Sequence, residues 1–183
     1  MEIRFATTND IEGIKALLKK YHTDTISDED RKDGFVTTNI TDAQLTDLIH
    51  KDGVMLAVDN GTVLGFAFAA DWKYWSQWPF FRHMIEIIPG HTYKGIELTA
   101  ENTYQYGPMC IDKSIRGSGT FEKVFKESLR SMKDKFPVML TFVNKVNGRS
   151  YNAHSNKAHL DTLDSFDFNN NHYYLMGCMT DME

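Results

Sequence analysis

The chain has 183 residues, of which 42% are hydrophobic and 25% charged, and its formal net charge is -5. The length predicts one domain with a single core, and the proportions are those of a globular chain, which excludes a disordered or low-complexity protein. An excess of acidic over basic residues argues against broad binding of nucleic acid, which needs a surplus of Lys and Arg.

The sequence also bounds where the protein works. No apolar run approaches the roughly 18–20 residues needed to cross a bilayer, and the first residues lack the order of a signal peptide. Two cysteines, Cys110 and Cys178, cannot form a disulfide framework, so a reducing compartment is the simpler expectation. We therefore expect a cytoplasmic protein without a membrane or nucleic-acid partner.

The N-terminal part of the chain predicts a short strand and a helix. Residues 2–6 alternate like an edge strand. Apolar side chains then recur at helical spacing over residues 9–22, where Asn9 and Glu12 form a capping-box-like start. An acidic stretch follows, with Asp24, Asp28, Glu29, Asp30 and Asp33. A solvated loop is the favoured interpretation of this stretch, and an acidic rim that attracts a substrate is the alternative.

A second helix and a hairpin come next. Thr41 and Gln44 form a capping box, and Gly53 stands where this helix is expected to stop. Two apolar runs are then joined by Asn60-Gly61, a dipeptide suited to a type I′ turn because both positions need positive φ. Residues 53–70 are therefore predicted to form a buried hairpin.

Residues 71–103 interrupt this regularity and hold all three tryptophans. Trp72, Trp75 and Trp78 are spaced to lie along one helical face. Three interpretations stay open for this segment: a packed helix that covers a sheet, a dimer interface, or an aromatic wall for a substrate. The first is favoured.

The next unit carries the clearest chemical signal. A strand over residues 103–112, interrupted by Gly107-Pro108, leads into a glycine-rich loop and a helix over 120–136 that Pro137 ends. Unpaired N–H groups at such a helix start, with basic residues close by, suit a phosphate. The alternative is an ordinary flexible turn. Neither the Walker pattern nor the dinucleotide fingerprint is complete here.

The C-terminal part predicts a buried strand over 138–143, a short polar helix or loop over 147–157, and a closing hairpin over 160–179. Strands and helices therefore alternate without an internal repeat or linker. This order predicts a single mixed α/β domain.

The chain resembles the GNAT superfamily of acyl-CoA-dependent N-acyltransferases. Arg116 and Gly119 match the first and fourth positions of that family's Gln/Arg-x-x-Gly-x-Gly/Ala motif, whereas Phe121 departs from the sixth. Downstream, Asn147 and Ser150 stand at family positions after the fifth strand, and His154 replaces the usual Tyr. The resemblance implies a mixed, twisted sheet of about seven strands with helices on both faces, covering residues 1–183 with an aromatic-rich insertion at about 71–103.

The resemblance also implies a function. It is N-acetyl transfer from acetyl-CoA to a primary amine by direct attack in a ternary complex, without a metal. The implied acceptor is a small-molecule or peptide amine, and a homodimer is possible. A non-catalytic CoA-binding sensor or interaction module of the same fold is the alternative. The absence of HExxH and CxxC patterns agrees with the expectation of no metal.

Site residues follow from the same resemblance. His154 is the expected general acid, and the alternative is a surface histidine on a short polar helix. Glu101 is taken as the base, although spacing alone does not prefer it over the other candidates, which are Glu97, Glu86, His83 and Tyr106. Cys110 is expected to be a small buried residue rather than a nucleophile. The residues expected to bind acetyl-CoA are Met109, Cys110, Ile111, Arg116, Gly117, Ser118, Gly119, Thr120, Asn147 and Ser150.

Overall fold

The computed structural model describes residues 1–32 and 34–182, so Asp33 of the acidic stretch lies outside the described residues. The chain divides into two compact units. Unit 1 comprises Met1–Ala69 and Gly107–Ser128, and unit 2 comprises Ala70–Tyr106 and the chain from Leu129 onward.

Unit 1 is built on an antiparallel hairpin. Strand β2 (Val54–Asp59) pairs with β3 (Thr62–Ala70) on one side and with β1 (Glu2–Phe5) on the other. Asn60 and Gly61, which join β2 to β3, have φ of 47° and 78°. The type I′ turn is therefore confirmed, because that turn requires positive φ at both positions.

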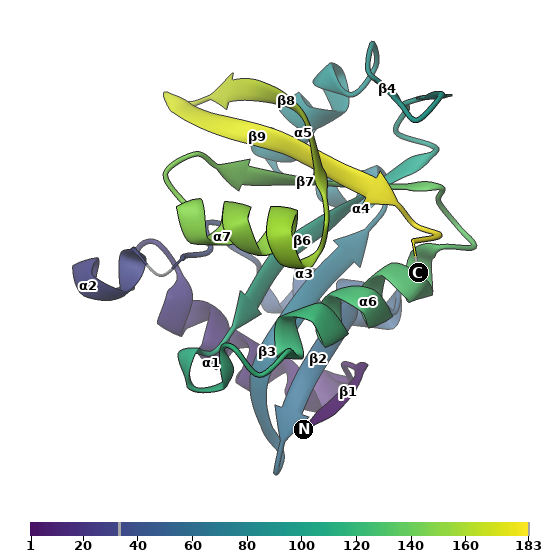
Figure 1. Ribbon diagram of the computed structural model, residues 1–183. Helices are drawn as coiled ribbons and strands as arrows, with labels where there is room; N and C mark the ends of the chain where they lie inside the picture. The colour runs from purple at the N-terminus through teal and green to yellow at the C-terminus, as the bar shows by residue number, and fades with distance from the viewer. Residues whose placement is uncertain (33, 183) are drawn as a thin grey trace. The chain divides into compact units, whose positions relative to one another are not determined.

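Three helices complete the N-terminal part of unit 1. They are α1 (Ile11–Tyr21), α2 (Asp28–Arg31) and α3 (Asp42–His50), and Figure 1 shows α1 and α3 on the same side of β2 and β3. The capping box at Thr41 is confirmed. The box expected at Asn9 is wrong: the N–H of Thr7 bonds the Asp10 carboxylate at 2.8 Å instead, because a 3₁₀ turn precedes α1.

The sheet of unit 2 contains β7 (Val138–Asn144), β8 (Asp161–Phe168) and β9 (Asn171–Met179), with β9 antiparallel to both neighbours. β6 (Thr103–Ile111) begins in this unit and runs parallel to β7. Their register pairs Thr103–Gln105 with Val138–Leu140.

The insertion in unit 2 differs from the single helix that the tryptophan spacing predicts. It contains α4 (Trp72–Trp75), α5 (Pro79–Ile87) and a small hairpin of β4 (Thr92–Tyr93) and β5 (Ile96–Glu97). Pro79 separates the helices, since proline suits the first position of a helix but not its interior. Figure 1 shows α5 and α7 (Gly148–Asn152) on opposite sides of β7 and β9.

The helix expected over 120–136 is shorter than predicted. α6 (Thr120–Met132) ends four residues early, where the N–H groups of Lys135 and Phe136 both bond the carbonyl of Met132. Its apolar face nevertheless follows the predicted spacing, with Val124, Phe125, Leu129 and Met132 buried.

The described residues form a mixed α/β fold. Their main sheet has seven strands in the order β1-β2-β3-β6-β7-β9-β8, mostly antiparallel. This agrees with the predicted class and strand number. Within the described ranges, no helix is both long and apolar enough to span a bilayer.

Candidate functional site

The glycine-rich loop of unit 1 joins the end of β6 to the start of α6. A 3₁₀ turn over Lys113–Ile115 is capped by Asp112, whose carboxylate accepts the N–H of Ser114 at 2.9 Å. Gly117 and Gly119 then take φ of 81° and 79°, which other residues rarely adopt. The loop therefore depends on glycine for its backbone path, and Thr120 begins the helix.

The C-terminal end of α1 holds this loop. Lys20 Nζ lies 2.5 Å from Asp112 Oδ2, and the hydroxyl of Tyr21 accepts the N–H of Lys113 at 2.8 Å. Burial raises the pKa of Asp112, but the hydrogen bonds from Lys20 and Ser114 more than offset it and bring that pKa to about 2. Asp112 is therefore charged at neutral pH and fixes the loop to α1.

Basic side chains surround the loop. Arg116 donates Nε–H to the carbonyl of Ile111 at 3.0 Å, and its guanidinium lies 5.2 Å from the centre of the Tyr21 ring. Lys113 forms an ion pair with Asp30 at 3.1 Å. The acidic stretch thus contributes a short helix and an ion pair to this surface rather than only a solvated loop. The cations and positive-φ glycines together fit an anionic group such as a pyrophosphate.

The other unit 1 candidates lie on the last part of β6. Cys110 and Ile111 are buried, and Met109 is half-buried. Burial is the main reason that the pKa of Cys110 rises to about 12. A thiol with this pKa carries almost no thiolate at neutral pH, so the expectation that Cys110 is not a nucleophile is consistent with its environment.

In unit 2, hydrogen bonds link three of the predicted residues. Asn147 caps α7, since its Oδ1 accepts the N–H of Ser150 at 3.2 Å. His154 lies one turn further on, and its Nδ1 is 2.8 Å from the carbonyl of Ser150. A carbonyl only accepts, so Nδ1 carries the proton and Nε2 is the acceptor nitrogen of the neutral ring.

His154 is buried rather than exposed on a polar helix, with 7% of its surface accessible. Burial lowers its pKa, and the bond to Ser150 only partly offsets this effect. Its ring lies edge-on to that of Tyr106, with centroids 6.2 Å apart. The imidazole is therefore neutral at physiological pH, and it must take up a proton before it donates one.

Gln105 and Thr141 are two residues that the sequence reasoning missed. Both bond the carbonyl of Tyr106: Gln105 Nε2–H at 2.6 Å and Thr141 Oγ1–H at 2.7 Å. All three residues are buried. The available signal was a polar side chain in the middle of each of two largely apolar strands.

The candidates for the general base lie in different environments. Glu101, Glu97 and Glu86 are exposed. His83 packs against the rings of Phe166 and Phe168. Tyr106 is fully buried, which raises its pKa well above the usual value and keeps its hydroxyl protonated.

Two of the tryptophans belong to the core of unit 2. Trp72 and Trp75 are 2% and 0% exposed, and Trp72 Nε1–H bonds Thr103 Oγ1 at 2.9 Å. The structure therefore favours the packing role over a dimer interface or substrate wall for these two side chains. Among the described residues, no group of three or more His, Cys, Asp or Glu side chains is arranged to hold a metal ion.

The described residues have the GNAT fold, which is defined by the strand order, the early helices and the loop that opens α6. The fold that the sequence resemblance implied is therefore confirmed. Among solved structures, a putative acetyltransferase, yncA, from Salmonella typhimurium with acetyl-CoA is similar at a TM-score of 0.64 and 14% identity, over 100% of this chain and 95% of that one. No protein-family model matches the chain, and no curated protein sequence matches it significantly.

Two further structures support the same fold. A ribosomal-protein-alanine N-acetyltransferase from Brucella melitensis has a TM-score of 0.60 and 16% identity, over 98% of this chain and 99% of that one. An N-acetyltransferase from Staphylococcus aureus has a TM-score of 0.62 and 15% identity, over 98% of both chains.

Proposed function

We propose that the protein is an N-acetyltransferase that moves an acetyl group from acetyl-CoA to the primary amine of a small molecule or peptide. The observation that carries the proposal is the loop Arg116–Thr120, with its two positive-φ glycines and its anchoring to α1 through Asp112 and Tyr21. The similar structures, which are named as acetyltransferases and match 98–100% of this chain, support the proposal.

In this proposal the loop of unit 1 binds the pyrophosphate of acetyl-CoA. Arg116 and Lys113 supply positive charge, and backbone N–H groups of Gly117–Thr120 supply donors. Met109, Cys110 and Ile111 bind the pantetheine arm through their backbone. Acetyl-CoA supplies a thioester carbonyl that is open to attack by an amine.

In unit 2, Asn147 and Ser150 hold the segment that carries His154 in place. The departing thiolate comes from a thiol with a pKa of about 8.5, so a proton donor helps but is not indispensable. His154 is the proposed donor, either directly or through a water that it orients. Glu101 is the proposed base that takes the proton from the amine. Because the neutral form of His154 is favoured, His154 must receive a proton before it donates one to the thiolate, and the proton taken up by Glu101 is a source for it.

Release of free thiol tests the proposal. The wild-type protein is mixed with acetyl-CoA and a panel of spermidine, tyramine, an aminoglycoside and a peptide with a free N-terminal alanine, and thiol release is followed with a chromogenic disulfide. We expect acetyl-CoA-dependent release with at least one amine, and a lower rate for His154→Asn. Binding of acetyl-CoA without release from any amine would instead favour the non-catalytic CoA-binding alternative.

A further inference from the structure

Two carboxylates of unit 1 pair with cations at the loop that opens α6, and the structure holds them differently. The side chain of Asp112 is only 6% exposed, and it accepts bonds from Lys20 and from the N–H of Ser114. The ion pair between Asp30 and Lys113 is open to solvent instead, since these side chains are 37% and 55% exposed. Asp112 is therefore a fixed part of the loop, whereas Asp30 reaches the loop from α2 through a contact that can exchange.

The charge of Asp30 faces the cations of the loop. Its carboxylate lies 3.1 Å from Lys113 Nζ. This bond is the main reason that the pKa of Asp30 is lowered, and a bond from Ser27 and the charge of Arg116 act in the same direction. Lys113 and Arg116 are the side chains proposed above to supply positive charge to a pyrophosphate. Asp30 therefore already neutralises part of the charge that this ligand would use.

The position of α2 is secured without this ion pair. Arg31 donates to the hydroxyl of Thr23 at 2.8 Å and to its carbonyl at 2.7 Å. Ser27 caps α2, because its Oγ accepts the N–H of Asp30 at 3.1 Å. These bonds remain when the carboxylate leaves Lys113, and an ion pair this exposed adds little to stability. The pairing of Asp30 with Lys113 is thus not needed to hold the helix.

We propose that Asp30 determines the affinity for acetyl-CoA as an internal anion, which the pyrophosphate of the ligand replaces on Lys113. This inference rests on the proposed function and adds a residue that does not itself bind the ligand. The ammonium group of a lysine forms the same kind of charge-assisted bond with a carboxylate as with a phosphate oxygen. Binding therefore exchanges one ion pair for another, and the ion pair that is lost weakens the binding.

The sign of the effect separates this role from a structural one. Without the charge of Asp30, Lys113 is released and the positive potential at the loop rises, so a pyrophosphate binds more tightly. If Asp30 only supported the shape of the loop, its removal would disturb the loop and weaken the binding. A gain in affinity is therefore expected only from the exchange or from repulsion between charges.

Asp30→Asn is the first test, because its amide removes the charge but keeps an oxygen that can accept the hydroxyl of Ser27. In isothermal titration with acetyl-CoA at about 50 mM NaCl, we expect a Kd about twofold to fivefold lower than that of the wild-type protein. The gain should shrink at about 500 mM NaCl, because salt screens exposed charges. Asp24→Asn is the matched control, since Asp24 is 72% exposed and lies beside His22 rather than Lys113, and its Kd should equal that of the wild-type protein.

Lys113→Met identifies the group through which Asp30 acts. Because the exchange takes place on Lys113, Asp30→Asn should lose most of its gain in affinity when it is combined with Lys113→Met. All variants are also titrated with inorganic pyrophosphate, which carries the charged group without the rest of acetyl-CoA. The order of their affinities should be the same for both ligands.

Three results would overturn the inference while the proposed function stands. They are an equal or higher Kd for Asp30→Asn, an equal gain for Asp24→Asn, and a full gain for Asp30→Asn in the presence of Lys113→Met, which would show repulsion without exchange. Tighter binding by Asp30→Asn without thiol release from any amine would support the inference and contradict acetyl transfer. If neither ligand binds to any variant, both the inference and the proposed function fail.

Discussion

At the scale of single residues, burial decides how the candidate site groups behave. Cys110 and Tyr106 are held in their protonated forms, since burial raises the pKa of both. Burial acts in the opposite direction on His154, whose neutral form is favoured. Burial also raises the pKa of Asp112, but hydrogen bonds from Lys20 and Ser114 lower it by more, so this carboxylate stays charged. The loop of unit 1 therefore holds a fixed charge, and the turn that follows α7 in unit 2 holds a neutral imidazole.

The neutral state of His154 predicts a pH dependence of stability. Its pKa is lower in the folded protein than in the unfolded chain, so the unfolded chain takes up the proton first as pH falls below about 6.5. The contribution of His154 to the free energy of unfolding is thus present above this pH and is lost as pH falls towards the pKa of His154 in the folded protein. The loss is at most about 1.4 kcal/mol for each pH unit between the pKa of the unfolded chain and that of the folded protein.

His154→Asn is the matched variant, because its amide keeps a donor for the carbonyl of Ser150 but does not titrate. Free energies of unfolding in urea, measured from pH 7.5 to 5.5, should fall more steeply for the wild-type protein than for His154→Asn. Parallel curves for the wild-type protein and His154→Asn would show that His154 is protonated to the same extent in the folded and unfolded states.

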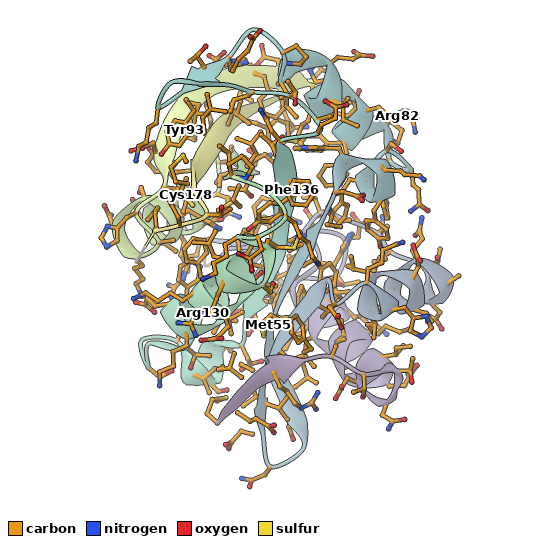
Figure 2. The ribbon with its side chains drawn as sticks, turned by 90° about the vertical axis from the view of Figure 1, so that its right-hand side faces the viewer. Met55, Arg82, Tyr93, Arg130, Phe136 and Cys178 are labelled. Atoms are coloured by element: carbon orange, nitrogen blue, oxygen red, sulfur yellow. The ribbon has the colours of Figure 1, made fainter. Side chains whose placement is uncertain are left out.

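At the scale of elements, the insertion of unit 2 is attached to β8 by two side-chain contacts. His91 Nε2 lies 2.7 Å from Asp164 Oδ2, and Tyr93, labelled in Figure 2, donates its hydroxyl to Asp161 at 2.6 Å. Burial lowers the pKa of His91, but Asp164 and the carbonyl of Ile88 raise it by more, so the net shift is upward. Both contacts join the region of the β4–β5 hairpin to an edge strand.

The His91 contact predicts looser attachment at alkaline pH. Because its pKa is raised by folding, its contribution is fully present below about pH 6.5 and is lost as pH rises through the pKa of the folded protein. Such partly exposed pairs contribute about 0.2–1 kcal/mol.

Amide hydrogen exchange over residues 88–98, corrected for the intrinsic rate, should therefore be up to about fivefold faster at pH 8.5 than at pH 6. In Asp164→Asn this difference should be absent. An equal pH effect in both proteins would contradict the attachment.

The insertion also shows why some elements were predicted and others were not. The turn at Asn60-Gly61 and the cap at Thr41 depend on residues that are neighbours in sequence, so their patterns predicted them. The contacts of His91 and Tyr93 depend on β8, which begins about 70 residues later. The spacing of the tryptophans predicted one helix because it takes no account of Pro79, which begins a second helix.

At the scale of the whole chain, the order of strands and helices was sufficient to predict the fold. The details of the site were less accessible. The loop residues Arg116 and Gly119 come from a local motif, but the groups that anchor the loop, Lys20 and Tyr21, are about 90 residues away in sequence. The burial of His154 likewise depends on tertiary packing, which the spacing of residues in the sequence does not predict.

Binding of acetyl-CoA, measured by isothermal titration calorimetry, tests the central claim most directly. We expect saturable binding to the wild-type protein and about tenfold or weaker binding to Gly119→Glu, which places a negative charge in the loop at a backbone position with φ of 79°. Gly95→Glu is the matched control, since Gly95 has a similar φ of 85° and open space around it but lies in the β4–β5 hairpin. Absence of binding at millimolar acetyl-CoA, or equal binding by Gly119→Glu, would contradict the account.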